Sequence, residues 1–175
     1  MSEALKEISL ILDVWDDIFS DFDPRPLDER AVSEDFINEL KKRYLETPKG
    51  ALLISFYAPK SLKDDQSEQM VIRRLRKHFR DKTLQAKRDI YRMRARGAVF
   101  VFVGMLSLIS ITLISYFNLV KDLAIRLLEI LFVPLGWFGI WEGFSKIINA
   151  SPLLVNEHEL YHKLSNAEYQ FHYEP

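Results

Sequence analysis

The sequence has no cysteine in its 175 residues, which excludes a disulfide scaffold and suits soluble parts kept in a reducing compartment. It also lacks a Walker phosphate loop, a dinucleotide-binding fingerprint and a nucleophile elbow, and we expect no cofactor. No basic stretch followed by an apolar core stands near Met1, so we expect no signal peptide. The length allows one small soluble domain and a membrane hairpin, but not a second enzyme fold.

The formal net charge of −1 averages over two segments of opposite sign. Residues 1–35 carry eleven acidic side chains against three basic ones, whereas residues 71–97 carry eleven basic side chains against two acidic ones. Because opposite charges attract, we expect some arginines of the basic segment to face the acidic one.

Two apolar segments predict membrane spans. Residues 98–120 contain no charge, and about 20 apolar residues are enough to cross the hydrocarbon of a bilayer. The second segment has an uncharged run of only 130–141, so the span predicted at 127–148 includes Glu129 and Glu142. A re-entrant segment is the alternative, and it is favoured by Pro134, Gly136 and Gly139.

The basic residues predict the orientation of these spans. Residues 77–96 supply eight lysines and arginines before the first span, whereas the connecting loop, 121–126, has only Lys121 and Arg126. We therefore expect a multi-pass protein of the cell membrane with its N-terminus in the cytoplasm. Two crossings return the chain to the same side, so the C-terminus is expected there too.

The region before the first span, residues 1–62, predicts a β-α-β unit. Two runs rich in leucine and β-branched residues, 7–13 and 51–57, indicate strands, and a capped amphipathic helix is expected between them from Ser33 to about Pro48. Such a unit favours parallel strands joined by a right-handed crossover. In the segment 63–97, apolar residues three or four apart predict a long basic juxtamembrane helix, with a break near Asp81 as the alternative.

The cytoplasmic tail, residues 149–175, predicts a helix and a strand. Ser151 and Pro152 mark a helix start. From Ala167 to Tyr173 apolar and polar residues alternate, as in a half-buried strand. A terminal strand needs a sheet to join, so we expect it to pair with the N-terminal strands and to bury Phe171 against them.

These elements together predict an α+β membrane protein. Its parts are a two-helix transmembrane hairpin and a small cytoplasmic α/β domain, whose three-stranded sheet is completed by the C-terminal strand.

A short motif in the tail matches the H-E-x-x-H pattern at His158, Glu159 and His162. In this pattern two imidazoles one helical turn apart bind zinc, and the glutamate activates water. A zinc protease also needs a third ligand and a substrate cleft, and only a short tail follows. The charged neighbours Glu157 and Lys163 favour the solvated face of an amphipathic helix instead.

Five aspartates follow the first strand, where α/β sheets commonly bind ligands. Their carboxylates suit Mg²⁺ or Ca²⁺, although the spacing is not that of an EF-hand. The structural alternative is that they cap turns and pair with nearby arginines. The five are Asp13, Asp16, Asp17, Asp21 and Asp23.

The basic segment beside the first span predicts contact with anionic lipid headgroups, because polybasic segments next to a membrane are attracted to them. The residues nearest the span are Arg88, Arg92, Arg94 and Arg96. Nucleic acid is the alternative partner of such a helix. The position beside a membrane favours lipid, and no nucleic acid is expected.

Small residues within the spans predict close helix packing. Gly104 lies on the first span, and Gly139 and Gly143 on the second form a G-x-x-x-G pattern with Gly136 one turn before it. Because two spans bury little surface by themselves, we expect several hairpins to associate into a homo-oligomer.

Two carboxylates within the second span are candidates for lining a pore or binding ions. Glu129 and Glu142 would face protein or water in an oligomer, as membrane carboxylates usually do. The alternative places each of them near an interface, with Lys146 pairing with Glu142 one turn away.

Three segments resemble an uncharacterised family of small two-span membrane proteins, and the resemblance covers nearly the whole chain. They are the D-F-D-P-R-P segment from Asp21 to Pro26, Gly136-Trp137 followed by Trp141-Glu142, and the tail from Lys163 to Phe171. The resemblance implies the two-span layout and no known activity. In layout alone, a basic helix followed by a two-span hairpin, the chain is also similar to SLATT-type membrane effectors, which are proposed to form pores.

The sequence does not decide whether the protein is an enzyme, and it favours a non-enzymatic one. The leading hypothesis is an oligomeric membrane protein whose cytoplasmic domain senses or docks a protein partner and whose hairpins form a channel-like or scaffold assembly. The alternative is a membrane-bound, metal-dependent hydrolase or phosphotransfer enzyme that uses the aspartate cluster from Asp13 to Asp23.

Overall fold

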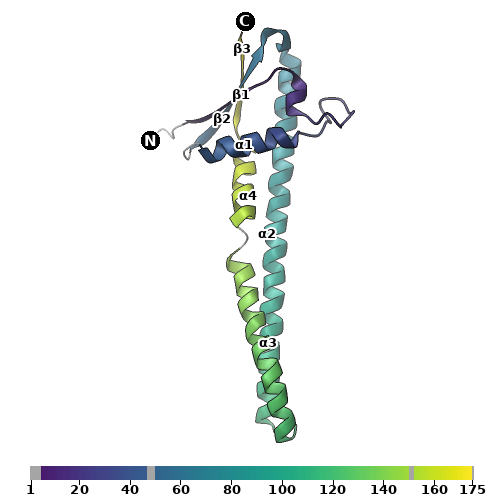
Figure 1. The fold of residues 1–175 in the computed structure, drawn as a ribbon, viewed down its shortest axis with the longest axis vertical. Helices are drawn as coiled ribbons and strands as arrows, with labels where there is room; N and C mark the ends of the chain where they lie inside the picture. The colour runs from purple at the N-terminus through teal and green to yellow at the C-terminus, as the bar shows by residue number, and fades with distance from the viewer. Residues whose placement is uncertain (1–4, 47–49, 150–151, 175) are drawn as a thin grey trace. The chain divides into compact units, whose positions relative to one another are not determined.

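The computed structural model describes residues 5–46, 50–149 and 152–174. The helix end predicted at about Pro48 and the helix start predicted at Ser151 lie outside these residues. The chain divides into two units, one formed by the residues up to Gln85 together with those from Glu157, the other by Ala86–Asn156. The elements, labelled in Figure 1, are β1 (Leu5–Ile11), a 3-10 helix (Trp15–Ile18), α1 (Glu34–Glu46), β2 (Ala51–Pro59), a 3-10 helix (Lys60–Leu62), α2 (Asp65–Tyr116), α3 (Asp122–Ile148), α4 (Pro152–Ser165) and β3 (Glu168–Glu174).

The first unit is built on a three-stranded parallel sheet in the order β1-β2-β3. Ile54 of the central strand pairs with Ile8 on one side and with Tyr169 on the other. The C-terminal strand, yellow in Figure 1, thus lies beside the N-terminal strands. This confirms the predicted fold class, including the sheet that the C-terminal strand completes.

The core of this unit lies on one face of the sheet. Both connections join parallel strands in sheet order, and the right-handed crossovers that such connections favour would place α1 and the parts of α2 and α4 in this unit on the same face. Leu40 of α1, Leu75 of α2 and Leu164 of α4 are fully buried together with Phe56 of β2. The apolar residues of the strands therefore alternate with residues on a face that no helix of the unit covers.

The terminal strand alternates as predicted, but its most buried residue is not the expected one. Tyr169 is buried and its hydroxyl donates a 2.8 Å hydrogen bond to the carbonyl of Leu164, whereas Phe171 is only half-buried. The ring of Phe171 lies 5.1 Å from that of Phe56 and 5.5 Å from that of Trp15. Because β3 is an edge strand, the core covers Phe171 on one side only.

The two long helices follow the predicted order, but the turn between them falls earlier than predicted. α2 continues through Asp81 without the break that was the alternative, and its part up to Gln85 belongs to the first unit. It ends at Tyr116, and Asn118 adopts a φ of 50°, which stops a helix. The turn therefore lies at 117–121 instead of 121–126, and α3 is one uninterrupted helix rather than a re-entrant segment.

Candidate functional site

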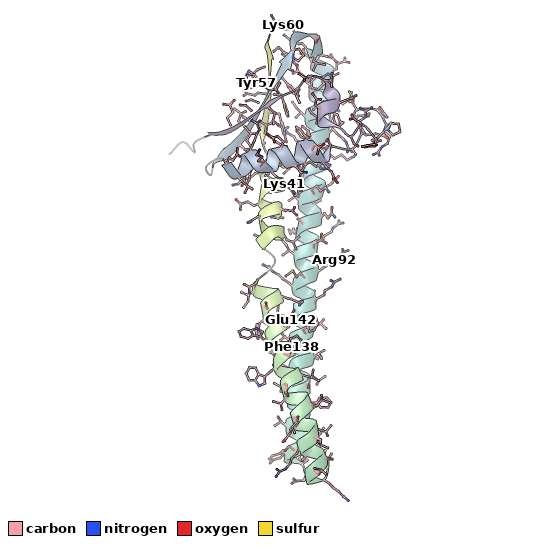
Figure 2. All side chains as sticks on the ribbon, in the orientation of Figure 1. Lys41, Tyr57, Lys60, Arg92, Phe138 and Glu142 are labelled. Carbon is pink, nitrogen blue, oxygen red and sulfur yellow. The ribbon has the colours of Figure 1, made fainter. Side chains whose placement is uncertain are left out.

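The second unit contains two helices that are long and apolar enough to cross a membrane, and their apolar side chains point outward. Only 17% of the apolar stretch of α2 and 6% of that of α3 are buried. Phe138, labelled in Figure 2, is one of many large side chains on the outside of α3. A core helix of a water-soluble protein would be mostly buried, whereas the apolar stretches of these two helices are mostly exposed.

The two helices contact each other through a seam of five glycines, all of which are buried. A Cβ atom added to Gly104 would lie 2.6 Å from the carbonyl oxygen of Gly136, and one added to Gly97 would lie 2.7 Å from that of Gly143. For Gly139 the nearest atoms would be 3.2 Å away. The predicted packing glycines are therefore used within one hairpin, where backbones approach closely only because side chains are absent.

The seam contains a residue that sequence reasoning missed. Gly97 precedes Gly104 by seven residues, which is two helical turns, so both lie on the same face of α2. This spacing was visible in the sequence, but Gly97 stands before the uncharged run and was counted with the basic helix. A hydrogen bond of 3.3 Å from the hydroxyl of Ser107 to the carbonyl of Phe132 adds a polar contact between the two helices.

The antiparallel register of the seam places Glu129 and Glu142 of α3 at different levels of the hairpin. Glu142 lies next to Gly143 and therefore level with Ala98, where the uncharged run of α2 begins. It forms a close ion pair with Lys146, one helical turn further along α3. This is the arrangement that the interfacial alternative predicted for Glu142.

Glu129 has a different environment. The same register places it level with Ile111, five residues from the end of α2 at Tyr116, or about 7.5 Å along the helix. It is half-buried, and no described residue forms an ion pair or hydrogen bond with its carboxylate. Of the two candidates, only Glu129 is left without compensation within the hairpin.

The aspartates after β1 stabilise the loop that follows this strand. The Asp17 carboxylate accepts hydrogen bonds from the backbone N–H groups of Asp13 (2.7 Å) and Val14 (3.0 Å). Asp16 pairs with Arg30 at 2.6 Å. Across the described residues no three His, Asp or Glu side chains gather closely enough to hold a metal ion.

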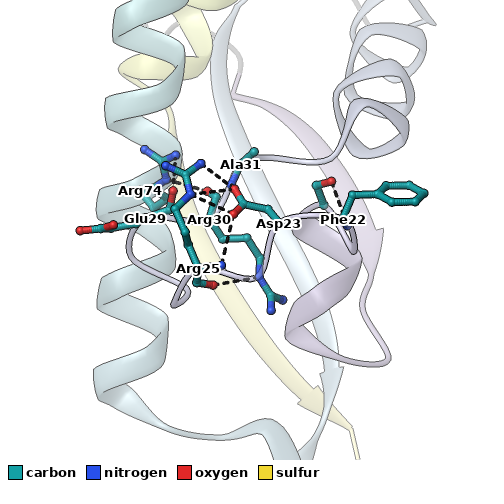
Figure 3. Close-up of polar contacts among 8 residues, drawn as sticks. Phe22, Asp23, Arg25, Glu29, Arg30, Ala31 and Arg74 are labelled. Carbon is teal, nitrogen blue, oxygen red and sulfur yellow. Dashed lines mark hydrogen bonds and ion pairs between the residues drawn. The ribbon is translucent and has the colours of Figure 1, made fainter.

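Asp23 is the most heavily hydrogen-bonded of the five, and Figure 3 shows its contacts. It accepts hydrogen bonds from the Arg25 guanidinium at 2.6 Å and from the N–H of Ala31 at 2.7 Å. These bonds, with that to Arg25 first, hold the pKa of the Asp23 carboxyl well below its usual range. The enzyme hypothesis therefore gains no support from a cluster whose members mainly close a loop.

An arginine of the basic segment contacts the acidic segment, as expected, but it binds backbone carbonyls there. Arg74 of α2 donates hydrogen bonds to the backbone carbonyls of Arg30 (2.9 Å) and Glu29 (3.0 Å), not to carboxylates (Figure 3). Such contacts cannot be predicted from the charges in the sequence, because a backbone carbonyl is present at every residue.

The H-E-x-x-H residues lie on α4 in the first unit. The rings of His158 and His162 are stacked with their centres 6.2 Å apart, and Glu159 pairs with Lys163 at 2.9 Å. They take part in no metal-binding group among the described residues. This geometry favours the solvated helix face.

At the end of the hairpin away from its turn, the basic part of α2 and the last turns of α3 enclose a groove of about 590 Å³. Arg92 and Arg96 line it from α2, and Ser145, Lys146 and Asn149 line it from α3. Of the four predicted headgroup contacts, the structure places these two arginines in the groove, while Arg88 and Arg94 do not line it. Ser145 and Asn149 were not singled out in the sequence, and Lys146 was considered only as a partner of Glu142, because the grouping of these residues depends on the helix register.

Comparison with protein-family models, with curated proteins and with solved structures found no match. The resemblance to the uncharacterised two-span family therefore stays a prediction.

Proposed function

We propose that this chain is a non-enzymatic, oligomeric protein of the cell membrane that crosses it twice. In this proposal its N- and C-terminal segments form one cytoplasmic α/β domain that docks a protein partner, and its hairpins assemble into a channel-like or scaffold structure. The observation that carries the membrane location is the outward-facing apolar surface of α2 and α3, of which 17% and 6% are buried.

The sheet supports the placement of both termini on one side. β3 pairs with β2 over seven residues, and strands separated by a bilayer cannot form such a ladder. The eight basic residues in 77–96 favour the cytoplasm as that side. Reporter fusions at the two termini are expected to report the cytoplasm together, and a C-terminus on the opposite side would contradict both the topology and the sheet.

Glu129 supports the proposed oligomer. A carboxylate within the hydrocarbon is costly unless it faces protein or water, and one hairpin offers Glu129 no partner among its described residues. The glycines of the seam are already used inside the hairpin, so association between copies would use another surface that includes Glu129.

The oligomeric state in detergent tests this step, because a monomer excludes a pore built from symmetric hairpins. Conductance of liposomes containing the full chain is the second measurement. Glu129→Gln is expected to change it, and Glu142→Gln, which removes a carboxylate already paired with Lys146, is the matched control. An equal effect of the two variants would show that the pairing of Glu142 does not matter to ion passage.

The open face of the sheet supports the docking of a partner. Ile11 of β1 is 81% exposed there, and the rings of Tyr57 and His172 are stacked with their centres 5.0 Å apart. An exposed apolar and aromatic surface on a rigid sheet is suited to binding another protein.

A further inference from the structure

We propose that the groove formed by Arg92, Arg96, Ser145, Lys146 and Asn149 is a binding site for the phosphate of one anionic phospholipid in the cytoplasmic leaflet, an inference that rests on the proposed membrane location. It differs from a general attraction of the basic helix to a negative surface, because it assigns one lipid to one place between two helices.

The position of the groove matches the level of lipid headgroups. Arg96 directly precedes Gly97, which contacts Gly143 where the apolar part of the hairpin begins. Phe100 and Trp141 are exposed on the apolar side of this level, where acyl chains would lie. A lipid whose phosphate occupies the groove thus has its chains beside side chains of matching polarity.

The charges in the groove leave one cation unpaired. Lys146 is paired with Glu142, and Arg92 lies 3.6 Å from Asp89 in an exposed and therefore weak ion pair. Arg96 forms no ion pair or hydrogen bond with any described residue, although it lies between these pairs. The groove carries three cations and two acids, which leaves a net positive charge.

The hydrogen-bonding groups in the groove suit a phosphate. The hydroxyl of Ser145 and the side-chain amide of Asn149 make no hydrogen bond within the described residues, so they and Arg96 offer free donors. A guanidinium presents its donors in a planar fork that binds phosphate oxygens in pairs. A phosphate diester has only acceptors and one negative charge, which complements these groups, whereas a choline headgroup adds a cation next to Arg92 and Lys146.

The test uses the full-length protein in uncharged detergent, after its insertion and topology in membranes have been verified. Native mass spectrometry measures binding of phosphatidylglycerol and of phosphatidylcholine with identical acyl chains. We expect one phosphatidylglycerol per chain, bound at least about tenfold more tightly than phosphatidylcholine, because the two lipids share the phosphate but the choline cation would be repelled by Arg92 and Lys146.

Two matched variants separate the groove from general charge attraction. Arg96→Gln is expected to weaken phosphatidylglycerol binding about tenfold, as loss of a charged hydrogen-bond partner does. Arg94→Gln removes the same charge two residues away, outside the groove, and is expected to weaken it less than about twofold. Asn149→Ala gives an independent check of the α3 side, with a smaller loss expected.

Three results would overturn the proposal. Equal binding of the two lipids would show that the protein has no preference for an anionic headgroup. Equal losses of binding in the Arg94 and Arg96 variants would show that the lipid is attracted by the charge of the basic helix and not bound in the groove. Displacement of phosphatidylglycerol by inorganic phosphate at equal concentration would make the ligand a soluble anion instead of a lipid. None of these results affects the verified insertion, so this inference can fail while the proposed topology stands.

Discussion

The two units of this protein bury opposite kinds of residue. In the α/β unit the largest side chains are innermost, and Phe56 and Phe79 are fully buried. In the hairpin the glycines are innermost, while Trp141 is 76% exposed. Water drives large apolar side chains together, but hydrocarbon does not, so helices in a membrane associate through close contact of small residues. The contrast therefore fits the proposed membrane location of the hairpin.

The largest effect is expected from removing β3 altogether. Truncation after Asn166 deletes the strand that pairs with β2 and the buried ring of Tyr169, whose replacement by alanine alone would cost about 3–5 kcal/mol. We expect the α/β unit to lose its cooperative unfolding while α3 stays helical in the membrane. Hydrogen exchange measures both, and slow exchange persisting in β2 of the truncated chain would show that the sheet does not depend on its terminal strand.

A matched pair of phenylalanines tests the contrast directly. Phe56→Ala is expected to destabilise the α/β unit by about 3–5 kcal/mol, because it opens a cavity in a closed core. Phe102→Ala, at a position 67% exposed on α2, is expected to cost about 0.5 kcal/mol or less. Free energies of unfolding from chemical denaturation in detergent measure the pair. A large loss for Phe102→Ala would mean that another protein surface covers this side of the hairpin.

The next effect concerns the glycine seam. The added methyl group of Gly104→Ala would meet the backbone of Gly136 at 2.6 Å and that of Ile140 at 2.8 Å, and neither can move like a side chain, so we expect a cost of about 1–3 kcal/mol. Gly139→Ala, with its nearest contact at 3.2 Å, is the control and should cost less.

Fluorescence energy transfer between labels on α2 and α3 measures how each glycine variant changes helix separation. If the two variants behave alike, the seam does not have the register described above.

The smallest expected effect is a loss of stability of the α/β unit in acid. Burial, with the charges of Lys82 and Arg74, lowers the pKa of His78 from its ordinary 6.5 to about 4, while Asp81 opposes this shift. Between these values the unfolded chain binds a proton that the folded chain does not, so stability falls as the pH drops from 6.5 towards 4. Because His78 is partly exposed, we expect a loss of about 1 kcal/mol.

The variant His78→Leu isolates this contribution, because leucine cannot be protonated. Its free energy of unfolding should depend less on pH than that of the unchanged protein across the same range. The Nε2 atom of His78 is buried without a hydrogen-bond partner among the described residues, which is the reason that protonation is unfavourable there. Identical pH profiles would assign the acid sensitivity to carboxylates instead.

Much of the fold could be predicted because it depends on local patterns. The alternation in β3, the apolar run of β2 and the three-to-four spacing in α2 each specify an element through the geometry of its own backbone. The need to pair a terminal strand then specified the sheet. The turn at 117–121 was misplaced because Asn118, the residue with a positive φ, gives a weak signal inside an apolar run.

The candidate sites could be predicted only in part. From sequence, Glu129 and Glu142 were equal candidates, although Lys146 was available as a partner for Glu142 alone. Arg92 and Arg94 were treated alike, since both stand in one basic segment. In the structure the two members of each pair have different contacts. Glu142 has Lys146 as its partner, and Arg92 lines the groove while Arg94 does not.

By itself, the sequence determined the strands, the helices, the apolar character of the two long segments and the charge of their flanks. These properties follow from the period and polarity of neighbouring residues. Only the tertiary structure decided that Gly97 meets Gly143, that Glu129 has no partner among the described residues and that Ser145 and Asn149 share a groove with Arg96. The physical reason is that contacts between antiparallel helices depend on where the turn falls, and a shift of one residue there would change every pair along the seam.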